Sequence, residues 1–170
     1  SLDVSGQDGD PKGMDWNGDG TKMYMIGNDN EKVYQYDLST AYDVGSATFS
    51  KSFSINSEDS GPRGMAFNDD GTKMYVVGAT NDKIFEYDLT TAYDVGSASF
   101  SGKSIDISSE DGSPQGMAWS GDGTKMYMVG DADDNVYQYD VGNPKFDIIA
   151  LHQHSTGVVA AEITHKGMLA

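Results

Sequence analysis

A block of about 51 residues occurs three times along the 170-residue chain, and this internal repeat restricts the fold more than any other feature. The string PKGMDW at residues 11–16 returns as PRGMAF at 62–67 and as PQGMAW at 114–119. DGTKMY follows each time, and VYQYD or IFEYD comes after it. A period of this length indicates a modular architecture in which each block is one supersecondary unit.

Each block has the pattern of four short β-strands and none of a helix. Glycine, methionine and an aromatic residue mark the first strand, and the small residue suits a crowded position near an axis. An Asp-Gly pair, a strong hairpin signal, leads into a second strand at 22–27. A third strand at 32–38 and a fourth from about 47 to 55 follow. We therefore expect an all-β protein, a β-propeller in which each block forms one blade of four antiparallel strands.

The repeat also divides the chain. We expect three blades in residues 1–142, at about 11–61, 62–113 and 114–142, the third completed by a further strand. Residues 143–170 leave the repeat and form a separate tail, in which 145–151 has the pattern of an apolar strand.

The repeated strings resemble the YVTN or lactonase-type propeller family over about residues 1–142, and are especially similar to Met/Tyr-rich propellers of marine bacteria and phages. The resemblance is specific for the fold. It implies little about activity, because that family combines lactonases with surface proteins.

Three blades are too few to close a ring, since propellers have 4–8 of them and open sheet edges invite pairing with another chain. Residues 1–5 align with 52–56, the end of a fourth strand, so 1–10 is expected to be the last strand of a preceding blade. That strand could complete the third blade of a second copy. We expect a homodimer that forms a six-bladed ring; the alternative is a fragment of a longer protein.

Charge excludes several partners. With 11 Lys and Arg against 27 Asp and Glu, the formal charge is −16, so neither nucleic acid nor an anionic membrane surface is an expected partner. The chain has no cysteine, which excludes disulfides and thiolate chemistry. The setting that suits such a surface is extracellular, on a cell or on a virion.

Many carboxylates are expected on one face, where the loops between second and third strands meet the loops that join blades. These are Asp8, Asp10, Asp29, Glu31, Glu58, Asp59, Asp82, Glu110, Asp111, Asp131, Asp133 and Asp134. Like charges gathered in this way repel unless a cation offsets them. Ca²⁺ is therefore a candidate ion, with Glu58, Asp59, Glu110 and Asp111 as weak candidate ligands, and a solubilising surface is the alternative.

Other metal patterns are weaker. Residues 15–20 resemble the start of an EF-hand loop, but Ile26 stands where a bidentate acid is required, so hairpin turns are expected instead. His152 and His154 have a spacing that suits metal ligands on a strand, without a third ligand.

Aromatic residues recur at equivalent positions in every block, which predicts a role in the packing between blades. Tyr42 and Tyr93, in the long connections before the fourth strands, are less constrained and could stack on a sugar ring. Together with Asp29, Asp82 and Asp134 they form the predicted ligand-binding set.

No catalytic constellation is visible in the blades, which hold no histidine and whose acids unique to one block, Asp15, Asp69 and Glu86, do not form an obvious pair. Near-identical blades favour repeated use of one surface, which adds avidity. We therefore expect a non-catalytic binding or structural module that recognises glycans or other surface ligands. The alternative, implied by the resemblance, is a lactonase-like hydrolase with a metal in the central channel.

Overall fold

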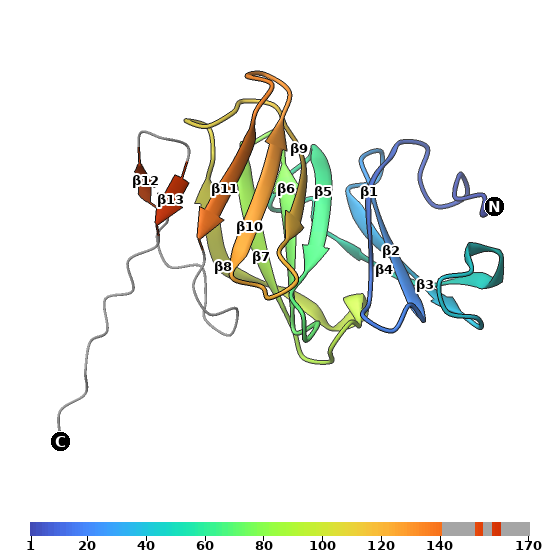
Figure 1. Cartoon of the computed structure of the whole chain (residues 1–170). Helices are drawn as coiled ribbons and strands as arrows, with labels where there is room; N and C mark the ends of the chain where they lie inside the picture. The colour runs from blue at the N-terminus through green and yellow to red at the C-terminus, as the bar shows by residue number, and fades with distance from the viewer. Residues whose placement is uncertain (141–151, 155–157, 161–170) are drawn as a thin grey trace.

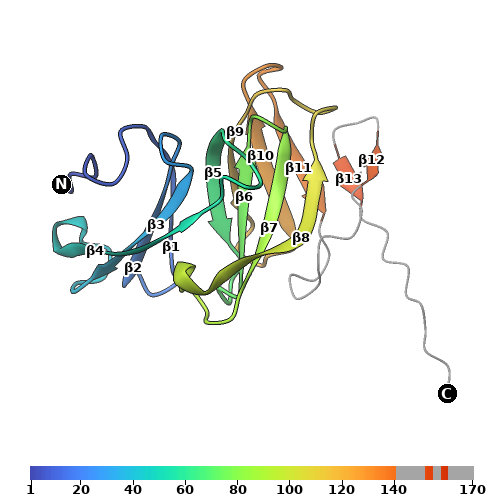
Figure 2. The same cartoon turned by 180° about the vertical axis from the view of Figure 1, so that it is seen from behind.

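A computed structural model describes residues 1–140, 152–154 and 158–160. These residues form three sheets, in which consecutive blade strands run antiparallel, and the sheets fan out around a common edge (Figures 1 and 2). The predicted all-β class and the four-stranded propeller blades are confirmed. No helix in the described part of the chain is long and apolar enough to cross a bilayer.

Each of the first two sheets is one complete blade with its strands in sequence order. Blade 1 consists of β1 (Pro11–Trp16), β2 (Lys22–Gly27), β3 (Lys32–Leu38) and β4 (Ala47–Ser54). Blade 2 consists of β5 (Pro62–Phe67), β6 (Lys73–Gly78), β7 (Lys83–Leu89) and β8 (Ala98–Asp106). Short 3-10 turns, η1 (Val44–Ser46) and η2 (Val95–Ser97), precede the two fourth strands.

The third sheet differs at its outer edge. Blade 3 has β9 (Pro114–Trp119), β10 (Lys125–Gly130) and β11 (Val136–Asp140), followed outward by β13 (Val158–Ala160) and β12 (His152–His154). β13 pairs with β11 in parallel, and only through Gln138 and Tyr139. The strand expected at residues 145–151 lies outside the described residues, as does most of the tail.

In each block a hairpin turn forms at the Asp-Gly pair between the first and second strands, as predicted. Gly20, Gly71 and Gly123 have φ values of 71°, 68° and 64°, which L side chains rarely adopt. The preceding carboxylate locks each turn; Asp19, for example, accepts bonds from the backbone N–H and the hydroxyl of Thr21 at 2.9 and 2.6 Å. These bonds explain why the sequence resembles the start of a calcium loop without an EF-hand being present.

The innermost strands β1, β5 and β9 lie side by side around the axis. A Cβ atom on Gly13 would lie 2.9 Å from the Cα of Gly64, and one on Gly64 would lie 3.0 Å from the Cα of Gly116. The repeated glycine therefore permits the close approach of neighbouring blades, as the sequence suggests.

Two apolar cores join the blades. In the first, the buried Tyr24, Ile26 and Val33 of blade 1 pack against side chains of blade 2, and in the second Tyr75 and Val77 of blade 2 pack against blade 3. The recurrent aromatic residues contribute to both cores, which confirms their predicted role.

The N-terminal segment is not a strand in the single chain. Residues 1–4 are irregular and residues 5–7 form a turn, while Leu2 and Val4 pack on the outer side of blade 1. A strand needs a hydrogen-bonding neighbour, and the described residues of the single chain offer none at this place. The strand predicted for residues 1–10 stays a prediction for an assembly.

Candidate functional site

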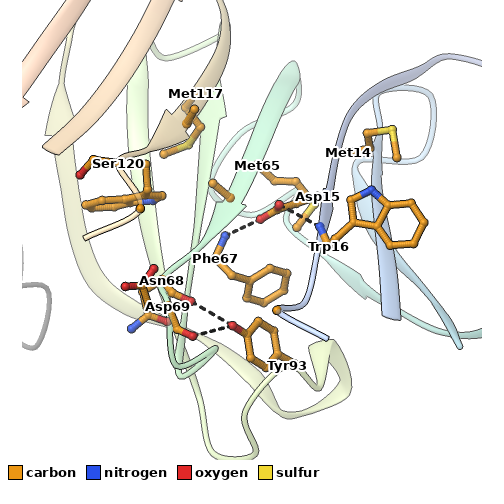
Figure 3. A pocket seen from close by; sticks show the side chains of 15 residues that line it. Met14, Asp15, Trp16, Met65, Phe67, Asn68, Asp69, Tyr93, Met117 and Ser120 are labelled. Atoms are coloured by element: carbon orange, nitrogen blue, oxygen red, sulfur yellow. Dashed lines mark hydrogen bonds between the residues drawn. The ribbon is translucent and has the colours of Figure 1, made fainter. Parts of the chain in front are cut away.

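A groove of about 470 Å³ runs along the axis where the three blades meet. Its walls are β1, β5 and β9, together with the hairpin turns after them and Tyr93 (Figure 3). We call this the axial groove. It is open because the three blades surround only part of the axis.

Asp15 is the carboxylate that the innermost strands contribute to the axial groove. Its Oδ2 accepts the backbone N–H of Phe67 at 2.9 Å, and its Oδ1 accepts that of Trp16 at 2.8 Å (Figure 3). Burial raises the pKa of Asp15 above its usual value, although these two donors oppose the shift. At the equivalent positions blades 2 and 3 carry Ala66 and Ala118.

Aromatic rings form the floor of the axial groove. Phe67 packs on Tyr93 with ring centroids 5.5 Å apart, and Trp119 packs on Tyr75 at 4.8 Å. The Nε1 of Trp119 is buried and has no hydrogen-bond partner among the residues that the structure describes. Trp16 completes the lining from blade 1.

Polar groups gather at the end of the axial groove formed by the hairpin turns. Asn68 is buried, and its Oδ1 accepts the N–H of Lys73 at 2.9 Å. Asp69 is exposed and stands where Gly18 and Gly121 occur in the other two blades. The axial groove thus combines aromatic walls with two carboxylates that break the repeat.

Tyr42 and Tyr93 lie at this same end, in the connections between third and fourth strands. Both have positive φ values, 60° and 58°. The hydroxyl of Tyr42 donates to the carbonyl of Gly18 at 3.1 Å, and that of Tyr93 donates to the carbonyl of Asp69 at 2.7 Å. Each tyrosine thus holds its connection against the hairpin turn of its own blade; Tyr93 also lines the axial groove.

The predicted acidic set lies at the opposite end of the blades, in the loops between second and third strands. Asp29 and Asp134 are exposed, whereas Asp82 is partly buried and its Oδ1 has no hydrogen-bond partner within the described ranges. Asp82 and Asp134 occupy equivalent positions, but their counterpart in blade 1 is Glu31, not Asp29. The structure therefore does not bring these three carboxylates and the two tyrosines to one site.

Asp59 and Asp111, proposed as weak calcium ligands, hold loops together. The carboxylate of Asp59 accepts the backbone N–H groups of Gly61, Thr80 and Asn81 at 2.7, 3.4 and 2.9 Å. Asp111 accepts the equivalent three bonds in blade 3. Burial acts to raise the pKa of Asp111, but these donors outweigh it and the pKa is lowered.

Glu58 and Glu110 are the other two candidates. Glu58 accepts bonds from the hydroxyls of Ser57 at 2.7 Å and Tyr87 at 3.3 Å, and Glu110 from Ser109 at 2.8 Å. Within the residues that the structure describes, no three His, Cys, Asp or Glu side chains are grouped to hold a metal ion.

Glu86, the third acid unique to one block, belongs to the interior of blade 2. It is fully buried, and its Oε1 lies 2.8 Å from the Nζ of Lys73. Sequence reasoning noted Asp15, Asp69 and Glu86 but did not place them. Each of these acids departs from the repeat, which was the signal available in the sequence. The structure places Asp15 and Asp69 in the axial groove and Glu86 in an ion pair inside blade 2.

Comparisons with known proteins support the fold. Neither protein-family models nor the sequences of curated proteins match the chain. Among solved structures it is similar to the periplasmic gluconolactonase of Pseudomonas aeruginosa, at 14% identity and a TM-score of 0.57, covering 91% of this chain and 39% of that one.

Two further structures extend this likeness. A candidate 6-phosphogluconolactonase from Bacteroides uniformis is 16% identical with a TM-score of 0.59, covering 88% of this chain and 39% of that one. The Swd1 β-propeller domain of Myceliophthora thermophila is 12% identical with a TM-score of 0.54, covering 75% and 39%. The chain therefore has a propeller fold shared with lactonases and with other proteins, and it spans about two fifths of these structures.

Proposed function

We propose that the chain is a non-catalytic binding module whose axial groove takes a neutral sugar or a related polyol. The observation that carries this proposal is the placement of Asp15 and Asp69, two carboxylates that break the repeat, beside aromatic rings in one groove. Binding pockets are mostly apolar, with a few polar groups that fix the ligand. Carboxylates accept bonds from hydroxyl groups, and aromatic faces pack on the C–H faces of a sugar ring.

A glycan array followed by calorimetry with a retained sugar tests this proposal. Asp15→Ala should weaken binding by at least about tenfold, since one charged hydrogen-bond acceptor contributes about 1.5–3 kcal/mol. The variant is expected to fold, because blades 2 and 3 carry alanine at the same position. Asp29→Ala, at the opposite end of blade 1, is the matched control and should bind normally.

The same experiment distinguishes binding in the axial groove from binding at the acidic loops. If Asp29→Ala, Asp82→Ala and Asp134→Ala weaken binding while Asp15→Ala does not, the ligand sits on the loops and the groove proposal is wrong. Calorimetry with millimolar Ca²⁺ tests the calcium prediction for the same loops, with Glu58→Gln and Glu110→Gln as variants. An extracellular, cell-surface or virion setting belongs to this proposal, because it suits a ligand of this kind and the charge of −16.

A lactonase-like hydrolase is the second candidate. The lactonases among the similar solved structures favour it, and so does Asp15, whose pKa burial raises. A carboxylate of raised pKa is suited to act as a general base toward a water molecule that attacks the lactone carbonyl. Lactone hydrolysis above the spontaneous rate, lost in Asp15→Ala, would replace the binding-module proposal with this one.

A further inference from the structure

We propose that two copies of the chain close into one six-bladed ring, in which blade 3 of each copy packs on blade 1 of the other. This inference is independent of the ligand. It rests on the two outer faces of the half ring, which carry the same residues as the faces already joined inside the chain. We call the face of a blade that packs on the next blade its front face, and the opposite one its back face.

The front face is a repeated apolar surface. In blade 1 it consists of Tyr24, Ile26 and Val33, each with 0% exposure because blade 2 covers them. In blade 2 the equivalent side chains, Tyr75, Val77 and Ile84, are equally buried against blade 3. A front face of this composition is therefore suited to pack against the back face of another blade.

Blade 3 carries the same front face, and no part of the chain that the structure describes covers it. Its equivalent residues are Tyr127, Val129 and Val136, and Val129 and Val136 are 43% and 70% exposed. A contiguous patch of exposed apolar side chains on a sheet face marks a site of association. Inside the chain, such a face is covered by residues of the next blade in the repeat. Another blade of this kind therefore has the shape that fits the exposed front face of blade 3.

Blade 1 offers the matching back face. Met23, Met25, Tyr34, Tyr36 and Leu38 form a cluster there, equivalent to the residues that blade 2 packs against blade 1. The parts of this chain packed on its outer side include the N-terminal segment, and a hollow of about 390 Å³ remains beside that segment.

Leu2 and Val4 show what belongs on this back face. They lie on blade 1 as Phe53 and Ile55 of blade 1 lie on blade 2. The segment therefore takes the place of the last strand of a preceding blade, although it forms no strand in the single chain.

Among the described residues, the edge of β11 leaves room for that strand. In blade 1, Val33 of β3 pairs with Phe53 of β4, so the repeat places Leu2 opposite the partner's Val136. β13 occupies β11 only at Gln138 and Tyr139, two residues further along. The N-terminal segment of one copy and β13 of the other can therefore share the edge of one strand.

Specific contacts support the same alignment. Inside the chain, Phe67 of blade 2 packs on Tyr24 of blade 1 with centroids 4.4 Å apart, and the hydroxyl of Tyr24 donates to the carbonyl of Tyr93 at 2.7 Å. The repeat makes Tyr127 the counterpart of Tyr24. In the ring it meets the partner's Trp16 and donates to the carbonyl of the partner's Tyr42.

Closure would also complete the axial groove. The three blades line one side of the axis, and a second copy related by a two-fold axis would supply the other side with a second Asp15 and a second Asp69. The groove would become a channel with two equivalent binding positions. The site is thus incomplete in a single chain.

Light scattering after size-exclusion chromatography tests the proposal over a range of protein concentrations. We expect a mass twice that of the chain. Val136→Lys should weaken the dimer by more than about 100-fold, because closure would bury an unpaired ammonium group. The lysine is solvated in the single chain, so the variant is expected to fold. Ser104→Lys, at an exposed position of β8 that faces no proposed interface, should stay dimeric.

Gly116→Ala is a second variant that does not depend on charge. In the single chain its Cβ would meet only the Cγ1 of Val129, at 3.6 Å, whereas the ring places the partner's Gly13 against it. It should also weaken the dimer while the fold is kept. A wild-type monomer at every concentration overturns the proposal, and so does a dimer that both variants leave intact. Sugar binding by a monomer would leave the proposed function standing while this inference fails.

Discussion

At the scale of single residues, one buried carboxylate per blade determines the shape of the loop between the second and third strands. Asp8, Asp59 and Asp111 are each about 2% exposed. A Cβ on the glycine that ends each second strand would lie within 2.3 Å of this carboxylate, as Gly78 shows for Asp59. The carboxylate and the glycine therefore pack as one unit. The structure of the loop explains why both recur in every blade, without reference to a ligand.

Asp59→Ala should lower the free energy of unfolding by about 2–4 kcal/mol, because three backbone N–H groups lose an ionised acceptor. Chemical denaturation followed by tryptophan fluorescence measures this. Asp131→Ala, at an exposed position of the equivalent loop in blade 3, is the control and should change the free energy by less than about 0.5 kcal/mol. Equal effects of the two substitutions would contradict the assigned role.

The carboxylates of the hairpin turns give the protein a defined acid sensitivity. Hydrogen bonds from the Ser120 hydroxyl and from Thr124 lower the pKa of Asp122 to about 2. A carboxyl group whose pKa is lower in the folded state stabilises the fold above its unfolded pKa, and that contribution is lost as the pH falls. The contribution of Asp122 should therefore disappear between about pH 4 and pH 2.

Thermal unfolding of the wild type and of Asp122→Asn at several pH values tests this sign. The difference in melting temperature should be largest above pH 4 and should vanish toward pH 2. A difference that grows as the pH falls would show that the turn carboxylate is not stabilising when ionised.

At the scale of elements, the glycine of each innermost strand determines how closely the blades approach. Gly64 lies between its two counterparts in β1 and β9. The sequence places all three glycines at the start of an apolar strand, and their position near the axis was predicted from that pattern. The clashing atoms were not, because they belong to strands more than 50 residues apart.

Gly64→Ala should destabilise the protein by about 1–3 kcal/mol, because its Cβ would meet backbone atoms of β9 at 3.0 and 3.3 Å that side-chain rotation cannot move away. Gly112→Ala, with no atom within 4 Å, is the matched control and should be nearly neutral. Denaturant midpoints compare the two variants. A neutral Gly64→Ala would mean that neighbouring blades can separate without loss.

At the scale of the whole molecule, stability should be highest in the middle blade. Along β6 successive side chains enter the two cores alternately: Met74 and Val76 pack toward blade 1, and Tyr75 and Val77 toward blade 3. In the part of the chain that the structure describes, one face of blade 3 is uncovered, and Val136 on it is 70% exposed.

Hydrogen exchange at low protein concentration should therefore be slowest in β6 and clearly faster in β11, since local opening follows the amount of buried apolar contact. Raising the concentration should slow the exchange of β11 if the ring closes. Exchange in β11 as slow as in β6 in a dilute monomer would show that the outer face of blade 3 is not open.

The sequence by itself determined the blades of this protein. The strands 22–27 and 32–38, the Asp-Gly turns and the recurrent core aromatics follow from local patterns, because a blade forms its hairpins among residues close in sequence. Only the tertiary structure decided which acids face the axis. Asp15 and Glu86 are each unique to one block, and Asp59 recurs in all three, yet Asp15 lines the axial groove, Asp59 holds a loop and Glu86 forms a buried ion pair. Those roles depend on neighbours that packing supplies across the sheets and blades, and no local pattern encodes such neighbours.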